Sequence, residues 1–135
     1  MSQTVSHGRE TILFVEDEPE IRQLAKMVLE HFGYRVLEAG SGVEALKIWQ
    51  ERKENINLLL TDMVMPEGVS GGELARKLQA ERPGLKVIYM SGYSVEILQK
   101  DLSGQKNFRF LEKPYKPQDL GKIVRETLDE KSLNA

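Results

Sequence analysis

Residues 56–62 read INLLLTD, an apolar run that ends on an acidic residue. A continuous apolar run of this length is typical of a strand buried on both faces of a parallel sheet. Parallel strands need crossover connections, which are usually helices, so helical segments should precede and follow this one. We therefore expect residues 56–61 to form the central strand of an α/β domain, with Asp62 directly at its carboxyl end.

The rest of the chain repeats the same strand–helix unit. Short apolar runs alternate with amphipathic segments, which predicts a single (βα)5 domain with a doubly wound parallel sheet. We expect the flavodoxin-like strand order 2-1-3-4-5. The expected strands are 11–15, 35–39, 56–61, 86–90 and 108–111, and the expected helices are 19–32, one that begins after Ser41, 73–81, 95–102 and 117–129.

The first expected helix carries apolar residues at a helical spacing. This spacing predicts a single buried stripe made of Ile21, Leu24, Ala25, Val28, Leu29 and Phe32. Arg22, Lys26 and Met27 lie off the stripe, so they either contact a partner helix or form a solvated face. Trp49 is expected to pack the second helix on the sheet.

The composition excludes several kinds of protein. A chain of 135 residues suits one domain, and we expect a flexible leader at 1–10, the domain at 11–130 and a tail at 131–135. The net charge of −2 offers no basic field for nucleic acid. There is no cysteine and no apolar stretch as long as a membrane span. We therefore expect no disulfide, no thiolate metal site and no membrane contact, which fits a cytoplasmic protein.

Polar side chains stand at the carboxyl ends of four expected strands. Glu16 and Asp17 follow the first strand, Asp62 the third, Ser91 the fourth and Lys113 the fifth. The carboxyl ends of strands in an open parallel sheet form the edge at which ligands bind. Carboxylates are ligands for Mg²⁺, and a lysine can neutralise a phosphoryl group. The sequence therefore predicts a site for Mg²⁺ and a phosphoryl group.

Each of these residues also has an ordinary structural explanation. Glu16 or Asp17 could cap the first helix, and Asp62 could be a turn residue before Pro66. Lys113 alone would usually be a solvated surface lysine. None of these explanations accounts for the whole set, so we favour the functional interpretation.

Four motifs, in order, resemble one family. They are FVEDE (14–18), LLLTDMVMP (58–66), YMSGYS (89–94) and FLEKPY (110–115). Together they resemble the CheY-like response-regulator receiver domain of two-component signalling, over about 11–130. The sequence segments SHGRETILFVEDE and VIYMSGYS are similar to the corresponding segments in receivers of hybrid sensor histidine kinases. The loop after Asp62 is one residue longer than the family pattern.

The resemblance implies a role for each acid. Asp62 would accept a phosphoryl group from a histidine on a partner kinase or histidine phosphotransfer domain. Asp17, Asp62 and the backbone carbonyl of Val64 would bind Mg²⁺ directly, and Glu16 would act through a bound water. Phosphoryl transfer of this kind depends mainly on positioning and charge neutralisation.

The resemblance also implies how the signal is read out. Lys113 would contact the phosphoryl oxygens, with a cis peptide bond to Pro114. Ser91 would donate its hydroxyl to the phosphoryl group and draw the loop after the fourth strand inward. Phe110 would change rotamer with Ser91, which would alter the surface around strand 4, helix 4 and strand 5. On strand alternation alone, Phe110 could instead be plain core.

Two other functions compete with a phospho-accepting receiver that is not an enzyme. The first is a Mg²⁺-dependent phosphohydrolase that uses an aspartyl phosphate. Such enzymes usually carry a second acid two residues after the nucleophile, where this chain has Val64. The second is a degenerate receiver used for contact alone, which the complete set of polar residues disfavours. We expect a monomer or weak dimer.

Overall fold

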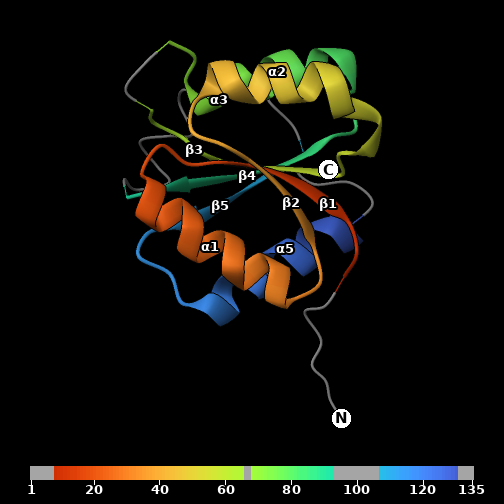
Figure 1. Cartoon of the computed structure of the whole chain (residues 1–135). Coiled ribbons are helices and arrows are strands. Elements are labelled where there is room, and N and C mark those ends of the chain that lie inside the picture. The colour runs from red at the N-terminus through yellow and green to blue at the C-terminus, as the bar shows by residue number, and fades with distance from the viewer. Residues whose placement is uncertain (1–7, 66–67, 93–106, 131–135) are drawn as a thin grey trace.

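The computed structural model describes residues 8–65, 68–92 and 107–130, and Figure 1 shows it as an α/β sandwich. The helix expected at 95–102 lies outside the described residues. The elements in chain order are β1 (Thr11–Val15), α1 (Pro19–His31), β2 (Arg35–Ala39), α2 (Gly42–Arg52), the 3₁₀ helix η1 (Lys53–Asn55), β3 (Leu58–Asp62), α3 (Gly71–Glu81), β4 (Lys86–Ser91), β5 (Phe108–Glu112) and α5 (Pro117–Asp129).

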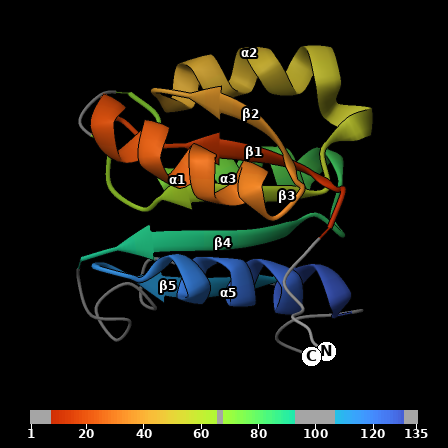
Figure 2. The same cartoon turned by 60° about the horizontal axis from the view of Figure 1, so that its bottom comes forward.

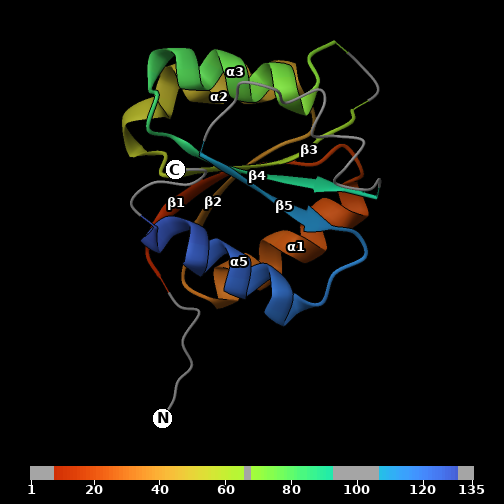
Figure 3. The same cartoon turned by 180° about the vertical axis from the view of Figure 1, so that it is seen from behind.

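The sheet confirms the expected topology. Its five strands are parallel in the order β2-β1-β3-β4-β5, which Figure 2 shows from top to bottom. Helices α2 and α3 cover one face, while α1 and α5 cover the other (Figures 1 and 3). The register pairs Val15 with both Ala39 and Thr61, and Asp62 with Met90, so the carboxyl ends of neighbouring strands lie level.

Strand alternation divides the core into two layers. Leu13 and Val15 join the layer under α2 and α3, whereas Ile12 and Phe14 join the layer under α1 and α5. Every residue of β3 is buried, as expected for the central strand. Trp49 is fully buried in the first layer and donates its indole N–H to Glu81 Oε1 at 3.1 Å. The prediction for Trp49 is therefore confirmed.

Most differences from the expected boundaries have local causes. β3 begins at Leu58 rather than residue 56, because η1 occupies Lys53–Asn55 and the Asn57 side chain accepts a hydrogen bond from the Thr11 amide at 2.9 Å. α3 begins at Gly71 rather than residue 73. Ser70 and Glu73 form a reciprocal capping box there, which places the start of the helix directly after Ser70.

The predicted stripe on α1 is only partly buried. Ala25 and Leu29 are buried as expected, but Ile21 is 36% exposed and Leu24 is 64% exposed. These two side chains line a hollow of about 350 Å³ between α1 and the segment that joins β5 to α5. Because the neighbouring segment leaves this space open, the first turns of α1 keep an apolar surface. The prediction that Ile21 and Leu24 are buried was wrong.

Gly71 lies where the backbone of α3 passes very close to the end of β3. A Cβ at this position would approach the Asp62 carbonyl oxygen and stand 3.0 Å from Met63 Cα. Both contacts are with backbone atoms, which cannot rotate away. Only glycine therefore allows α3 to begin so close to Asp62.

We expect Gly71→Ala to destabilise the fold by about 3 kcal/mol, because the added methyl overpacks a rigid contact. Chemical denaturation of both variants and the wild type would measure the change. Gly84→Ala is the matched control, since a Cβ there meets nothing within 4 Å. Equal stability of the two variants would contradict the close approach at Gly71.

Candidate functional site: a carboxylate–lysine cluster at the sheet edge

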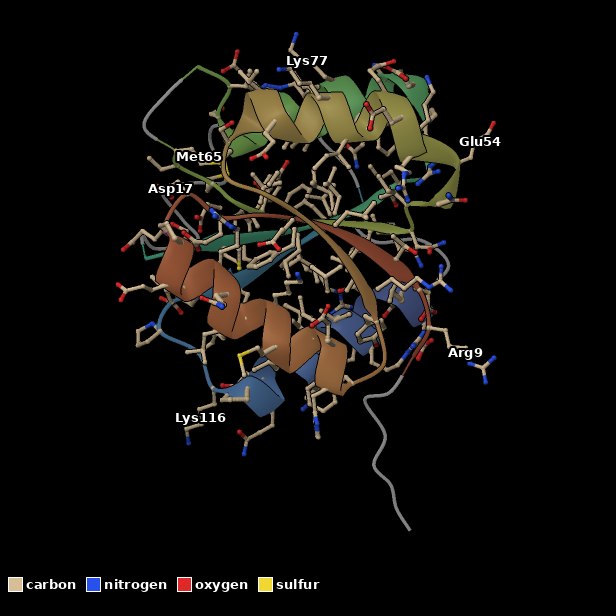
Figure 4. All side chains as sticks on the ribbon, in the orientation of Figure 1. Arg9, Asp17, Glu54, Met65, Lys77 and Lys116 are labelled. Carbon is tan, nitrogen blue, oxygen red and sulfur yellow. The ribbon has the colours of Figure 1, made fainter. Side chains whose placement is uncertain are left out.

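The strand ends bring the predicted polar residues together at one edge of the sheet. Two hydrogen bonds extend the strand pairing past the strand ends and fix the backbone there. The Glu16 amide donates to the Ala39 carbonyl at 3.0 Å, and the Lys113 amide donates to the Ser91 carbonyl at 2.8 Å. Figure 4 shows Asp17 at this edge, beside the region of Met65.

Three carboxylates converge at this edge. Glu16, Asp17 and Asp62 each place one oxygen within 4.8 Å of the others. Glu16 and Asp62 are buried, and Asp17 is half-buried. Glu16 Oε2 accepts the Glu18 amide at 3.1 Å. The site therefore concentrates negative charge where little water can solvate it.

Lys113 links the two buried acids. Its Nζ lies 2.6 Å from Asp62 Oδ1 and 3.1 Å from Glu16 Oε1. The peptide bond between Lys113 and Pro114 is cis, as the resemblance implied. A single ammonium group thus faces two carboxylates in contact with each other, which leaves the cluster short of positive charge.

The electrostatics follow from this imbalance. Burial, and then the hydrogen bond between the Asp62 and Glu16 carboxyl groups, raise the pKa of Asp62 to about 8. Burial also opposes ionisation of Glu16, but its hydrogen bonds with Asp62 and the Glu18 amide, and the charge of Lys113, hold its pKa below the usual value. Burial is likewise outweighed at Lys113, whose pKa is raised by Asp62 and Glu16. At neutral pH the two acids therefore share one proton.

The donor set fits a divalent cation such as Mg²⁺. Among the described residues, Asp62 Oδ2 is a buried oxygen without a hydrogen-bond partner. A buried oxygen of this kind carries a desolvation cost that a cation would remove. Mg²⁺ is usually bound by one or two carboxylates together with water and phosphate oxygens, which these acids can supply. A bound cation would take the place of the shared proton.

Arg22 is a site residue that the sequence interpretation missed. Its Nη1 donates to the Glu16 carbonyl at 2.7 Å, and its Nε lies 3.3 Å from Glu38 Oε1. Lys26 also pairs with Glu38, at 2.8 Å. Arg22 therefore anchors the acidic turn to β2, and Lys26 pairs with the same strand, so neither residue forms a free face. The signal was their place one and two turns into the helix after the acids, but Glu38, which pairs with both, lies on another strand.

The remaining predicted residues lie around the cluster. Ser91 is buried at the end of β4. Val64 follows β3 closely and is 59% exposed. Phe110 is half-buried on the α2–α3 side of the sheet, where its ring centroid lies 5.7 Å from that of Tyr89 and 5.5 Å from that of Phe108. The roles expected for these three residues remain predictions.

Comparisons with known proteins identify the class. Residues 12–125 match the response regulator receiver domain, and the chain belongs to this family of two-component signalling domains. It is 38% identical over 122 residues to the sensor kinase CckA of Brucella abortus (strain 2308), covering 90% of this chain but 13% of that kinase. It is 35% identical over 117 residues to the response regulator receiver protein CpdR of the same strain, covering 87% of this chain and 95% of CpdR.

A solved structure agrees in fold. The response regulator TrrA of Thermotoga maritima, in complex with Mg²⁺ and BeF, is 32% identical to this chain with a TM-score of 0.75, covering 87% of this chain and 98% of TrrA. Receiver domains of this family accept phosphoryl groups from histidine kinases or phosphotransfer proteins. In the part of the chain that the structure describes, no helix is long and apolar enough to cross a membrane.

We expect the metal-free protein to lose stability as the pH rises toward 8. The pKa of Asp62 is about 8 in the folded chain, against an ordinary value of 3.8, so between these values the folded state binds more protons than the unfolded state. At about pH 8, Asp62→Asn should therefore be more stable than the wild type by at least about 1 kcal/mol. The difference should shrink at about pH 6, where Asp62 is protonated.

Thermal unfolding in a chelator at both pH values would test this expectation. Glu54→Gln removes an acid far from the cluster (Figure 4) and should follow the wild type. Excess Mg²⁺ at the higher pH should stabilise the wild type more than Asp62→Asn. Equal unfolding temperatures for the wild type and Asp62→Asn at both pH values would contradict the shared proton.

Proposed function

We propose that Asp62 is the phosphoryl acceptor of this receiver. The observation that carries the proposal is the buried Asp62 carboxylate, which touches Lys113 through Oδ1 and leaves Oδ2 without a partner among the described residues. An Asp62 carboxylate oxygen attacks the phosphorus of a phosphohistidine on the partner. The phosphorus–nitrogen bond breaks, the imidazole leaves, and an acyl phosphate forms on Asp62.

The neighbouring residues supply charge and position. Mg²⁺, when bound, neutralises the phosphoryl oxygens. Asp17, Asp62 and the Val64 carbonyl are the proposed direct ligands of the cation, and Glu16 acts through water. Lys113, which pairs with Asp62, also contacts the transferred phosphoryl group. Its ammonium group stabilises the negative charge that transfer spreads over the equatorial oxygens.

The output of transfer is a change of surface. The Ser91 hydroxyl donates to the new phosphoryl group, and Phe110 repacks with it. Both residues belong to strands at one side of the sheet, β4 and β5, which pair from Val87–Phe108 to Ser91–Glu112. The surface around β4 and β5 would therefore report the state of Asp62; the helix expected at 95–102, which was predicted to share this role, lies outside the described residues.

The competing functions fit the site less well. A phosphohydrolase of the aspartyl-phosphate type would need an acid two residues after Asp62, where the exposed apolar side chain of Val64 cannot transfer a proton. A receiver used for contact alone has no need of buried acids that share a proton beside a lysine, an arrangement that costs stability. The protein therefore acts as a stoichiometric acceptor and not as a turnover enzyme.

We expect Mg²⁺ and acetyl phosphate to add one phosphoryl group to the wild type, because the cation and Lys113 together neutralise the incoming charge. Intact mass spectrometry would detect the adduct, which should be absent in Asp62→Asn and in a chelator. Glu54→Gln should label like the wild type. Phosphate release without an adduct would favour the phosphohydrolase, and neither adduct nor release would favour contact alone.

The apolar hollow beside Lys113 is the proposed docking surface for the partner. Ile21 and Leu24 border it from α1, and it is lined further by Val28, Pro114, Tyr115, Pro117 and Leu120. Met27, also on α1, is 61% exposed. An amphipathic helix can lay its apolar face into such a groove. A helix of a histidine kinase or phosphotransfer domain docked here would carry its histidine toward Asp62.

We expect Leu24→Glu to slow phosphoryl transfer from a kinase at least about tenfold, because it places a charge in an apolar contact. The donor would be an autophosphorylated hybrid kinase, without its own receiver, that labels the wild type. Labelling by acetyl phosphate should be unchanged. Val43→Glu, a similar exposed residue on α2, is the control. Equal transfer to both variants would place the docking surface elsewhere.

The wider setting is also a proposal. We infer that residues 11–130 act as the receiver, flanked by a leader and a short tail. The receiver works as a monomer or weak dimer. It acts in the cytoplasm, where ATP is the phosphate source for the partner kinase. The similarity to CckA covers only 13% of that kinase, which supports a receiver of the hybrid-kinase type. The similarity to CpdR, along 95% of its length, equally supports a receiver that acts alone.

A further inference from the structure

A second hollow lies at the amino end of the sheet, opposite the acidic cluster. It has a volume of about 550 Å³, and three arginines from separate parts of the chain line it: Arg9, Arg35 and Arg52. Thr11, Gly33, Leu37 and Asn55 complete the lining. In Figure 4, Arg9 and Asp17 stand at opposite ends of the molecule, so this hollow is separate from the phosphoryl-acceptor site.

The fold explains why these arginines meet. Arg35 alternates with Leu37 and Ala39 on β2, and both of those residues pack in the core layer under α2 and α3. Arg35 therefore faces the same side as α2. Arg52 is the last residue of α2, and Arg9 precedes β1, which pairs with β2 from Thr11 opposite Arg35. Three exposed arginines from separate segments thus line one hollow at this end of the sheet.

Their positive charge is not neutralised by the protein. In residues 8–65, 68–92 and 107–130, no ion pair involves Arg9, Arg35 or Arg52, and no acidic side chain lines the hollow. The nearby Glu10 pairs with Arg125 instead, at 2.8 Å. The negative end of the α2 dipole favours Arg52. It does not account for Arg9 or Arg35, which lie on other segments.

We propose that this hollow binds a phosphate-bearing small molecule of nucleotide size. Its volume falls within the range of ligand sites, about 300 to 1,000 Å³. Guanidinium groups match phosphate oxygens in a bidentate manner and are weakly hydrated, so three of them favour a polyanion. Leu37 offers an apolar surface for a base or other ring, and Thr11 and Asn55 offer hydrogen-bonding groups at its edge.

The test is titration calorimetry of the full chain with ATP as the probe, at low salt and in a chelator. The chelator removes divalent cations, which could otherwise hold the phosphates of ATP at the acidic cluster. We expect ATP to bind with a Kd below about 1 mM, and adenosine not to bind. Arg35→Gln and Arg52→Gln should each weaken ATP binding at least about fivefold, because each removes a bidentate phosphate contact.

Arg76→Gln is the matched control, because Arg76 is an exposed arginine of α3 that does not line the hollow. It should bind ATP like the wild type. All three variants should unfold at the wild-type temperature and accept phosphoryl groups from acetyl phosphate normally, which separates this site from Asp62. If pyrophosphate binds as tightly as ATP, the site recognises only the phosphate groups of the ligand. That result would still support an anion site in this hollow.

Three results would overturn the proposal. The first is no ATP binding up to about 5 mM, which is weaker than a specific site of three arginines should allow. The second is an equal loss in Arg76→Gln, which would mean non-specific attraction to positive charge. The third is binding of a polyglutamate peptide, but not ATP, that depends on Arg35 and Arg52, which would make the hollow a contact for an acidic protein segment.

Discussion

The contact of Lys113 with Asp62 and Glu16 is the interaction on which the functional structure depends. It joins residues at the ends of three strands, and it requires a parallel sheet whose carboxyl ends lie level. One ammonium group cannot neutralise two buried carboxylates and leaves a proton shared between them. The site is therefore incomplete in the electrostatic sense, and a cation and a phosphoryl group are the species that would complete it.

Several packing features keep this costly arrangement in place. Arg22 holds the Glu16 carbonyl from α1, and Gly71 lets α3 begin against the Asp62 carbonyl. The burial of β3 on both faces places Asp62 at the end of the most constrained strand. The stability of the two core layers thus offsets the burial of acids at the edge, which is the usual relation between a rigid scaffold and a strained site.

The two ends of the sheet have opposite electrostatic character. The carboxyl end gathers Glu16, Asp17 and Asp62, while the amino end gathers Arg9, Arg35 and Arg52. The net charge of −2 does not show this separation, because it adds the negative charges at one end to the positive charges at the other. An apolar surface on α1 adjoins the acidic end. A nearly neutral chain can therefore carry distinct surfaces for a cation, an anion and a protein partner.

The sequence by itself determined the alternation of strands and helices and the polar residues at the strand ends, because these follow from hydrophobic period and from where each strand ends. The strand order, and with it the convergence of the acids and Lys113, was expected from the flavodoxin-like topology. The sequence could not determine contacts between residues distant along the chain. Leu24 belongs to the stripe on α1 by period, yet it is exposed because the segment after β5 stands away from it. The pairing of Arg22 and Lys26 with Glu38 on β2, and the meeting of three arginines, likewise depended on how strands and helices pack, which only the tertiary structure decided.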